Sequence, residues 1–332
     1  MSTLTHDTSH GGPIVPVPPR ARLGTGLVLA LVSAGSFGMS GALARGLLDG
    51  GWSVGAIVTL RIGIAAVVLL PFALVALRGR WDLLRRNAGL IVFYGLLAVA
   101  GAQFCYFSAV QYMQVGPALL IEYTAPAAVV VWMWLRHGQR PGLMTLAGAG
   151  LAALGLVLVL DLLSGADLSV PGVLWALGAM VGCAAYYIIN GDDTTGLPPI
   201  VLATGGLVVG AVVVALLGLV GLLPMDSSTV DVTYAGASFS WWQPVLVLAV
   251  FTAALSYVTG VAAGRLLGSR LASFVALTEV VAGVLWAWLL LDELPRSIQI
   301  VGGLLILAGV IGVKMGERSV VVEEHVEEPV PA

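Results

Sequence analysis

The chain has 332 residues, of which 59% are hydrophobic and only 10% are charged, and its formal net charge is -3. Soluble domains carry about 25% charged residues, so this composition excludes a soluble globular fold and predicts a protein embedded in lipid. The small net charge decides nothing further, because the position of each charge determines how a membrane chain is oriented.

Both ends of the chain are polar. Residues 1–20 are rich in Pro and Gly and contain no apolar run, which predicts a disordered tail and not a cleavable signal peptide. Residues 317–332 carry several glutamates and end in prolines, which predicts an acidic, solvated tail.

Between the tails, ten apolar runs are each long enough to cross a bilayer as a helix, which takes about 17–25 residues. The runs are continuously apolar and do not alternate, which excludes a barrel of strands. We therefore predict an all-α integral membrane protein with ten transmembrane helices. The expected spans are 24–45, 53–77, 88–110, 115–135 and 143–161, followed by 170–190, 197–223, 242–264, 270–291 and 298–316.

Arginine and lysine predict the orientation, because they gather on the cytoplasmic side of membrane proteins. If the N-terminus lies inside, only Arg45 and Arg296 fall in outside segments, and Arg61 falls within a span. The inside segments then hold Arg20, Arg22, Arg78, Arg80, Arg85, Arg86, Arg136, Arg140, Arg265, Arg270, Lys314 and Arg318. We expect a multi-pass protein of the inner (plasma) membrane with both termini in the cytoplasm.

The second half of the chain repeats the first. A shift of 154 positions (286 minus 132) relates the pairs Trp132–Trp286, Pro141–Pro295, Gly148–Gly302 and Gly155–Gly309. Near the start of each copy the shift is 146 (172 minus 26, for Gly26 and Gly172). The second copy is therefore eight residues longer, and this insertion fits in the long stretch 224–241.

Five spans per copy is an odd number, so the second copy must enter the membrane from the opposite side. We expect two inverted five-helix repeats, 23–163 and 168–316, between tails 1–22 and 317–332.

The glycines of the fifth and tenth spans recur every seven residues and therefore mark one face of each helix. Small residues on a shared face allow close helix contact, which predicts a scaffold role for both spans. That face could pack within the chain or against a second copy.

Three charged side chains stand out because they lie well inside predicted spans and away from the span ends: Arg61, Glu122 and Glu279. Each costs at least about 2.5–3.5 kcal/mol to insert, so a function is expected to retain it. Arg61 and Glu122 both lie about seven residues from the outer end of their spans, roughly 10 Å below the surface at about 1.5 Å per residue. Glu279 lies near the middle of the ninth span. All three could surround one cavity close to the midplane.

This charge set fits a zwitterion. Arg61 would bind a carboxylate, for which a planar guanidinium offers bidentate geometry. Glu122 or Glu279 would hold an ammonium group or a coupling proton, since burial disfavours an ionised carboxylate. The alternative is an Arg61–Glu122 ion pair that only neutralises both charges.

Polar and aromatic side chains at similar depth extend the expected substrate-binding group: Gln103, Tyr106, Ser108, Thr124 and Tyr257. Tyr106 and Tyr257 lie on the corresponding third and eighth spans and could line a cavity symmetrically. For each tyrosine the alternative is ordinary packing, with the hydroxyl bonded to a backbone carbonyl.

The chain resembles the EamA-type branch of the drug/metabolite transporter superfamily over about residues 24–316. The marks are Arg61 in TLRIGIAAVVLLP and the run TEVVAGVLWAWLLLDELPRSIQIVGGLLILAGV at 278–310, with Glu293-Leu294 ahead of Gly302-Gly303. Residues 93–127, with the Glu-aromatic-Thr-x-Pro run from Glu122, are similar to threonine/homoserine-type amino-acid exporters of that branch. The resemblance implies a ten-span transporter of metabolites.

Motifs of other protein classes are missing from the sequence. It has no Walker A sequence, no HExxH motif and no His/Ser pair within a span, which argues against an enzyme, a metal site and a bound cofactor. The basic residues serve topology and do not form a nucleic-acid patch.

We therefore predict a secondary transporter that exports a small polar metabolite, with an amino acid or derivative favoured. We expect alternating access and a role for protons, in a monomer or homodimer within the bilayer. The alternatives are import of a sugar, nucleotide derivative or vitamin, and, in another class, a non-transporting scaffold or an intramembrane enzyme.

Overall fold

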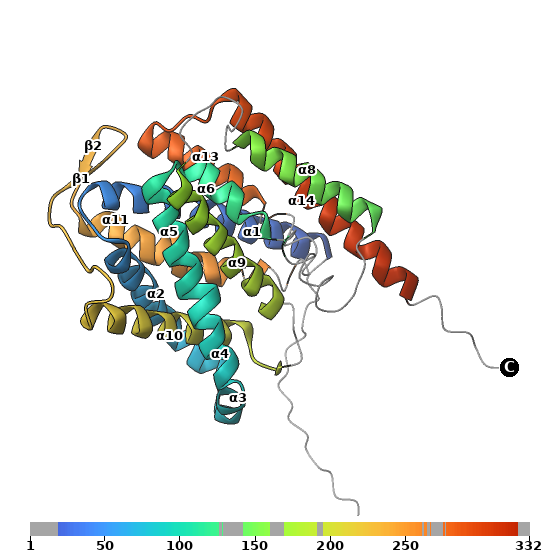
Figure 1. The fold of residues 1–332 in the computed structure, drawn as a ribbon. Helices are drawn as coiled ribbons and strands as arrows, with labels where there is room; N and C mark the ends of the chain where they lie inside the picture. Colours follow the sequence, from blue (N-terminus) through green and yellow to red (C-terminus); the bar gives the residue numbers. More distant parts are fainter. Residues whose placement is uncertain are drawn as a thin grey trace, which may run out of the picture.

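The computed structural model describes residues 19–125, 142–159, 169–190, 195–260 and 277–324, together with positions 128, 262, 263, 266 and 275. Within this part of the chain the fold is helical apart from one short hairpin, in agreement with the expected all-α class (Figure 1). The segments 1–18 and 325–332 of the two predicted tails lie outside the described residues.

The helices are α1 (Pro19–Asp49), α2 (Val54–Leu77), α3 (Trp81–Arg86), α4 (Ala88–Tyr94), the π-helix η1 (Gly95–Gly101), α5 (Ala102–Tyr112), α6 (Val115–Glu122), α8 (Leu143–Val159), α9 (Val170–Asn190), α10 (Pro199–Leu219), α11 (Trp242–Leu246), the π-helix η3 (Val247–Leu255), α13 (Thr278–Leu291) and α14 (Ser297–Glu324). The hairpin consists of β1 (Val232–Tyr234) and β2 (Ala237–Phe239), paired antiparallel.

Among the described residues, five helices are long and apolar enough to cross a membrane: Leu23–Asp49, Val54–Leu77, Ala88–Tyr112, Pro199–Leu219 and Trp242–Gly260. Shorter apolar helices cover Leu143–Val159, Val170–Tyr186, Thr278–Leu291 and Ser297–Gly312. The predicted span 115–135 is described as helix chiefly over α6, because most of 126–141 lies outside the described residues. Helix α14 continues to Glu324, past the predicted end of its span at 316.

Helix α2 shows how the sequence sets one of these boundaries and divides its faces. The Ser53 side chain accepts a hydrogen bond from the backbone N–H of Ala56 and caps the start, as serine often does. The helix ends at Arg78, whose backbone is left-handed with φ of 36°. Ile62 is fully buried, whereas Val67 is 71% exposed, so one face joins the core while the other is left for lipid.

The glycine faces of the fifth and tenth spans pack against each other within this chain. Helices α8 and α14 lie side by side along one edge of the bundle (Figure 1). A Cβ at Gly155 would lie 2.5 Å from the Gly302 carbonyl oxygen, and one at Gly309 would lie 2.5 Å from the Gly148 carbonyl oxygen. The pairing runs antiparallel, because the earlier glycine of α8 meets the later glycine of α14. Glycine is therefore required for this approach, as the repeat predicted.

The hairpin is a feature that the sequence analysis missed. It lies in the stretch 224–241, where the comparison of the two repeats required an insertion. The Tyr234 hydroxyl donates to the Leu43 carbonyl at 2.6 Å, and the Ala235 N–H donates to the Leu290 carbonyl at 2.9 Å. The inserted residues therefore fasten the ends of α1 and α13.

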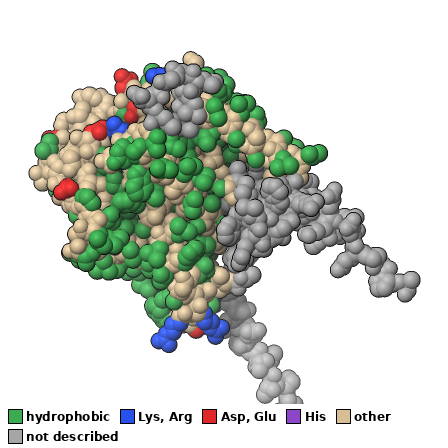
Figure 2. Space-filling model, in the orientation of Figure 1, with side chains coloured by type: hydrophobic (Ala, Val, Ile, Leu, Met, Phe, Trp, Pro, Cys, Tyr) green, Lys and Arg blue, Asp and Glu red, His purple; other side chains and the backbone are tan. Residues whose placement is uncertain are grey.

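The two ends of the bundle differ in charge. Blue side chains gather at the α3 end in Figure 2, where α3 and the turn before it carry Arg78, Arg80, Arg85 and Arg86. Red side chains gather mostly near the hairpin end, where Asp49, Asp226, Asp231, Asp292 and Glu293 lie in or beside the loops. Hydrophobic side chains cover most of the face between the two ends.

Candidate functional site

Arg61 lies about two turns into α2, which begins at Val54, and is only 1% exposed. Its Nη1 donates to the Gln103 Oε1 of α5 at 2.8 Å, and its Nη2 donates to the Thr252 carbonyl of η3 at 3.0 Å. Both acceptors are neutral. The Nε atom is buried and has no hydrogen-bond partner. The hydrogen bonds of this buried cation therefore include no counter-charge and leave one donor unused.

Two aromatic rings flank the same guanidinium. Its Cζ atom lies 5.1 Å from the ring centre of Phe37 on α1 and 5.2 Å from that of Phe107 on α5. Cation–π attraction offsets part of the cost of burying Arg61. The rings also fix the plane of the guanidinium, so that its free edge has a defined direction.

Tyr257 joins this group from the segment that follows η3. Its ring packs edge-on against Phe37 with centres 6.0 Å apart, and Tyr257 interacts electrostatically with Arg61. We call Arg61, Gln103, Tyr257, Phe37 and Phe107 the Arg61 cluster. It draws on α1, α2, α5 and the segment after η3, and therefore on both halves of the chain.

The two glutamates lie beside the Arg61 cluster. Glu122 is the last residue of α6, Glu279 stands in the first turn of α13, and both are half-buried. Each interacts electrostatically with Arg61, and they interact with one another. The Tyr123 side chain hydrogen-bonds to Glu279. The structure thus brings the three predicted charges into one region.

The expected alternative, an Arg61–Glu122 ion pair, is wrong for this conformation. Among the described residues the ion pairs within 4.0 Å are Arg45–Asp49 and Arg86–Asp82, and neither involves Arg61. The physical reason is that Gln103 and the Thr252 carbonyl already hold the guanidinium.

The remaining predicted residues divide into two groups. Tyr106 is buried on α5, its hydroxyl is unpartnered, and it interacts electrostatically with Arg61, so it belongs near the cluster. Ser108 is buried on the same helix, but five residues from Gln103 turn it about 140° away from that side chain. The Thr124 hydroxyl donates to the Ile121 carbonyl at 2.7 Å and so serves the end of α6.

Three contributors were missed by the sequence analysis: Phe37, Phe107 and the Thr252 carbonyl. Phenylalanine in an apolar span carries no signal that separates a site from lipid contact. The carbonyl comes from a π-helix, where the regular hydrogen-bond ladder is interrupted and a backbone oxygen can accept from a side chain. Functional sites often use such turns.

The two π-helices occupy matching positions in the two halves. Adding the repeat shift of 154 to η1 (95–101) gives 249–255, which falls within η3 at 247–255. Helix α2 packs against η3, and α10 packs against η1. Each π-helix therefore contacts the second span of the other half. A charged residue is present at only one of these two contacts. Arg61 lies on α2 and bonds to η3, whereas the repeat shifts of 146 and 154 place the position equivalent to Arg61 in the apolar run of α10.

Comparison with known proteins also indicates a membrane transporter. The uncharacterized inner membrane transporter YicL of Salmonella typhimurium is 22% identical over 88% of this chain and 96% of its own. The threonine/homoserine exporter RhtA of Escherichia coli K12 is 26% identical over 90% of this chain and 92% of its own. A solved crystal structure matches with a TM-score of 0.58 and 22% identity, over 90% of this chain and 98% of its own, which shows a shared fold.

The match to a transporter family covers both halves. The EamA-like transporter family matches residues 24–161 and again residues 170–315, so nearly all of the apolar part of the sequence is included. The family and the named relatives are transporters, and the apolar helices agree with an integral membrane protein. The chain belongs to the EamA-like transporter family.

Proposed function

We propose that this protein is a secondary active transporter that exports a small polar metabolite, an amino acid or a derivative of one, by alternating access. The observation that carries the proposal is Arg61, a buried guanidinium with neutral partners, set beside two half-buried glutamates. A site with one fixed cation and two carboxylates is complementary to a zwitterion.

The substrate carboxylate would approach the free edge of Arg61, where the unpartnered Nε offers a donor. Planar guanidinium and carboxylate groups form paired, charge-assisted hydrogen bonds, so the anion would be oriented as well as bound. The ammonium group would lie toward Glu122 and Glu279. Tyr106 has an unpartnered hydroxyl for a further substrate polar group.

Charge balance supports a role for protons. Arg61 with both glutamates ionised carries a net charge of minus one, and one proton on either glutamate brings the three residues to neutrality. A zwitterion leaves this balance unchanged. A site in a low-dielectric region favours the neutral combination, so proton and substrate occupancy would be linked.

The same proposal includes ten spans arranged as two inverted repeats, 23–163 and 168–316, with both termini in the cytoplasm. The matching π-helices and the antiparallel α8–α14 contact support it. The basic α3 end would then face the cytoplasm and the hairpin end would face outward. The relative named an inner membrane transporter supports the inner membrane.

The test is flux from proteoliposomes that contain the purified protein and a panel of radiolabelled amino acids. L-Threonine and L-homoserine lead the panel because they appear in the name of the relative RhtA. We expect efflux of at least one amino acid, faster when the opposite side is acidic. Sugars, nucleotides and vitamins form a second panel. Flux confined to that panel would overturn the amino-acid assignment, and no flux in either would favour the scaffold alternative.

A further inference from the structure

The loop between α13 and α14 is fastened to the start of α6 by one carboxylate. Glu293 Oε2 accepts a hydrogen bond from the Val115 N–H at 3.1 Å. Val115 is the first residue of α6, where backbone N–H groups lack partners within the helix and favour a negative charge. The carboxylate therefore acts as a helix cap supplied by the other half of the chain.

Contacts of Arg45 hold the same turn, between α5 and α6, from the α5 side. The Arg45 Nη1 of α1 donates to the Val110 carbonyl near the end of α5 at 2.6 Å, and its Nε pairs with Asp49 at 3.2 Å. The turn from α5 to α6 thus has a cation on the carbonyl end of one helix and an anion on the N–H end of the next. Both placements complement the helix dipoles.

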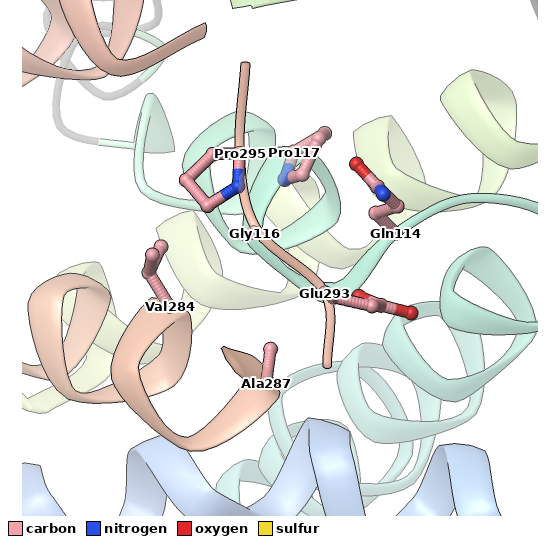
Figure 3. Close-up of a pocket in the computed structure, with 7 residues that line it drawn as sticks. All are labelled: Gln114, Gly116, Pro117, Val284, Ala287, Glu293 and Pro295. Carbon is pink, nitrogen blue, oxygen red and sulfur yellow. The ribbon is translucent and has the colours of Figure 1, made fainter. Parts of the chain in front are cut away.

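Glu293 stands in a small pocket between α6, α13 and the α13–α14 loop (Figure 3). The lining residues are Gln114, Gly116, Pro117, Val284, Ala287, Glu293 and Pro295. The helices approach closely here, since a Cβ at Gly116 would lie 3.3 Å from Val284 Cγ2 and one at Gly283 would lie 2.5 Å from Leu119 Cδ2. The contact between α6 and α13 is closed at this end.

The fastened helices are those that carry the two glutamates of the candidate site. Glu122 lies seven residues beyond Val115, about 10 Å along α6 at about 1.5 Å per residue. Glu279 lies in the first turn of α13, and the other end of this helix, at Leu291, is two residues before Glu293. Movement of the Glu293 end would therefore be transmitted to both carboxylates.

We propose that Glu293 is a positioning residue that latches α6 to the α13–α14 loop, and that breaking this latch opens the substrate site toward the hairpin end. The inference rests on the proposed transport function for its purpose, but the latch itself is a structural property. In an exporter it would break for substrate release and re-form for the return step.

The groups around Glu293 act on the charge that it carries in the latch. Burial raises the pKa of the Glu293 carboxyl above its ordinary value, and nearby Asp49 raises it further, while the Val115 N–H and Arg45 lower it. The hydrogen bond to Val115 and the nearby Arg45 therefore both favour the ionised carboxylate that caps α6.

The test uses a thiol behind the latch in purified protein in detergent, which requires no substrate. Leu119→Cys is introduced after Cys105 and Cys183 are replaced by Ala, and its rate of reaction with a maleimide is divided by that of an exposed Thr229→Cys. We expect Glu293→Ala to raise this ratio at least roughly fivefold. Glu293→Gln, which keeps an acceptor oxygen for the Val115 N–H, should keep the ratio lower than Glu293→Ala does.

Asp231→Asn, an exposed change of the same charge at the same end, is the matched control and should leave the ratio unchanged. A ratio in Glu293→Ala equal to wild type would overturn the latch. If that variant does not fold, the pair Gly116→Cys and Val284→Cys gives a second test, because a disulfide there would hold the latch shut. Oxidised protein that labels and transports as fast as reduced protein would contradict the inference. Failure of every substrate with latch-dependent labelling intact would instead count against the proposed function alone.

Discussion

At the scale of single residues, the central feature is a buried arginine that is not neutralised by a carboxylate. Arg61 is held by an amide oxygen, a backbone carbonyl and two aromatic rings. Removing a guanidinium from water costs several kcal/mol, and these partners return only part of that cost. Under the proposed function, a substrate carboxylate would supply the counter-charge that these partners lack.

The sequence predicted which charges lie in the membrane, because each interrupts an apolar run. It could not predict how they pair, since pairing depends on side-chain directions and on the carbonyl that η3 makes available. Gln103 and Tyr257 were expected near Arg61 from depth alone, and both belong to the Arg61 cluster, where Gln103 accepts from Arg61 and Tyr257 packs against Phe37. Depth alone also suggested Ser108, which the turn of α5 directs away from Gln103, and Thr124, whose hydroxyl donates to the Ile121 carbonyl, because rotation about the helix axis matters as much as depth.

The glutamates give the clearest prediction at this scale. We expect Glu122→Gln and Glu279→Gln each to reduce efflux at least about tenfold, because an amide neither carries a proton nor attracts an ammonium group. Both variants should insert and unfold at temperatures close to wild type, because neither carboxylate forms an ion pair with Arg61. Initial rates in proteoliposomes and thermal unfolding in detergent are the two measurements. Full transport by both variants would remove the proton and ammonium roles.

At the scale of elements, the α8–α14 pair shows a feature that sequence could establish almost completely. The seven-residue spacing of glycines marked one face on each helix, and the structure places those faces in contact within the chain. The choice between an internal partner and a second copy needed the fold. The π-helices are the opposite case, because a single extra residue in a helical turn leaves no clear mark in an apolar sequence.

A substitution within this contact tests its importance. We expect Gly302→Ala to destabilise the protein by about 1–3 kcal/mol, because its Cβ would lie 2.6 Å from the Gly155 carbonyl oxygen and 2.8 Å from the Val159 nitrogen, and backbone atoms cannot move aside cheaply. Gly150→Ala on α8 is the matched control. A Cβ there has no atom within 4 Å, so it should be neutral or slightly stabilising. Equal melting temperatures for the two variants would show that the α8–α14 contact is not tightly packed.

At the scale of the whole molecule, the two halves share the features of the scaffold but differ in the buried charged residues of the candidate site. Glycines and π-helices recur in both halves, whereas Arg61, Glu122 and Glu279 have apolar counterparts. The hairpin is another departure, and it fastens α1 and α13 at one end. Under the proposed function, the two similar halves move around a site that takes Arg61 and Glu122 from the first half and Glu279 from the second.

This account depends most directly on recognition of a zwitterion by Arg61 and the glutamates. The deciding measurement is counterflow of a transported amino acid in proteoliposomes, with its methyl ester and its N-acetyl derivative as competitors. Neither should compete with exchange by the wild-type protein, because each lacks one of the two charged groups. Arg61→Lys should lower exchange at least about tenfold, since an ammonium cannot replace a planar guanidinium, while the exposed Arg85→Lys should not. Effective competition by the methyl ester, together with unimpaired exchange by Arg61→Lys, would contradict the account.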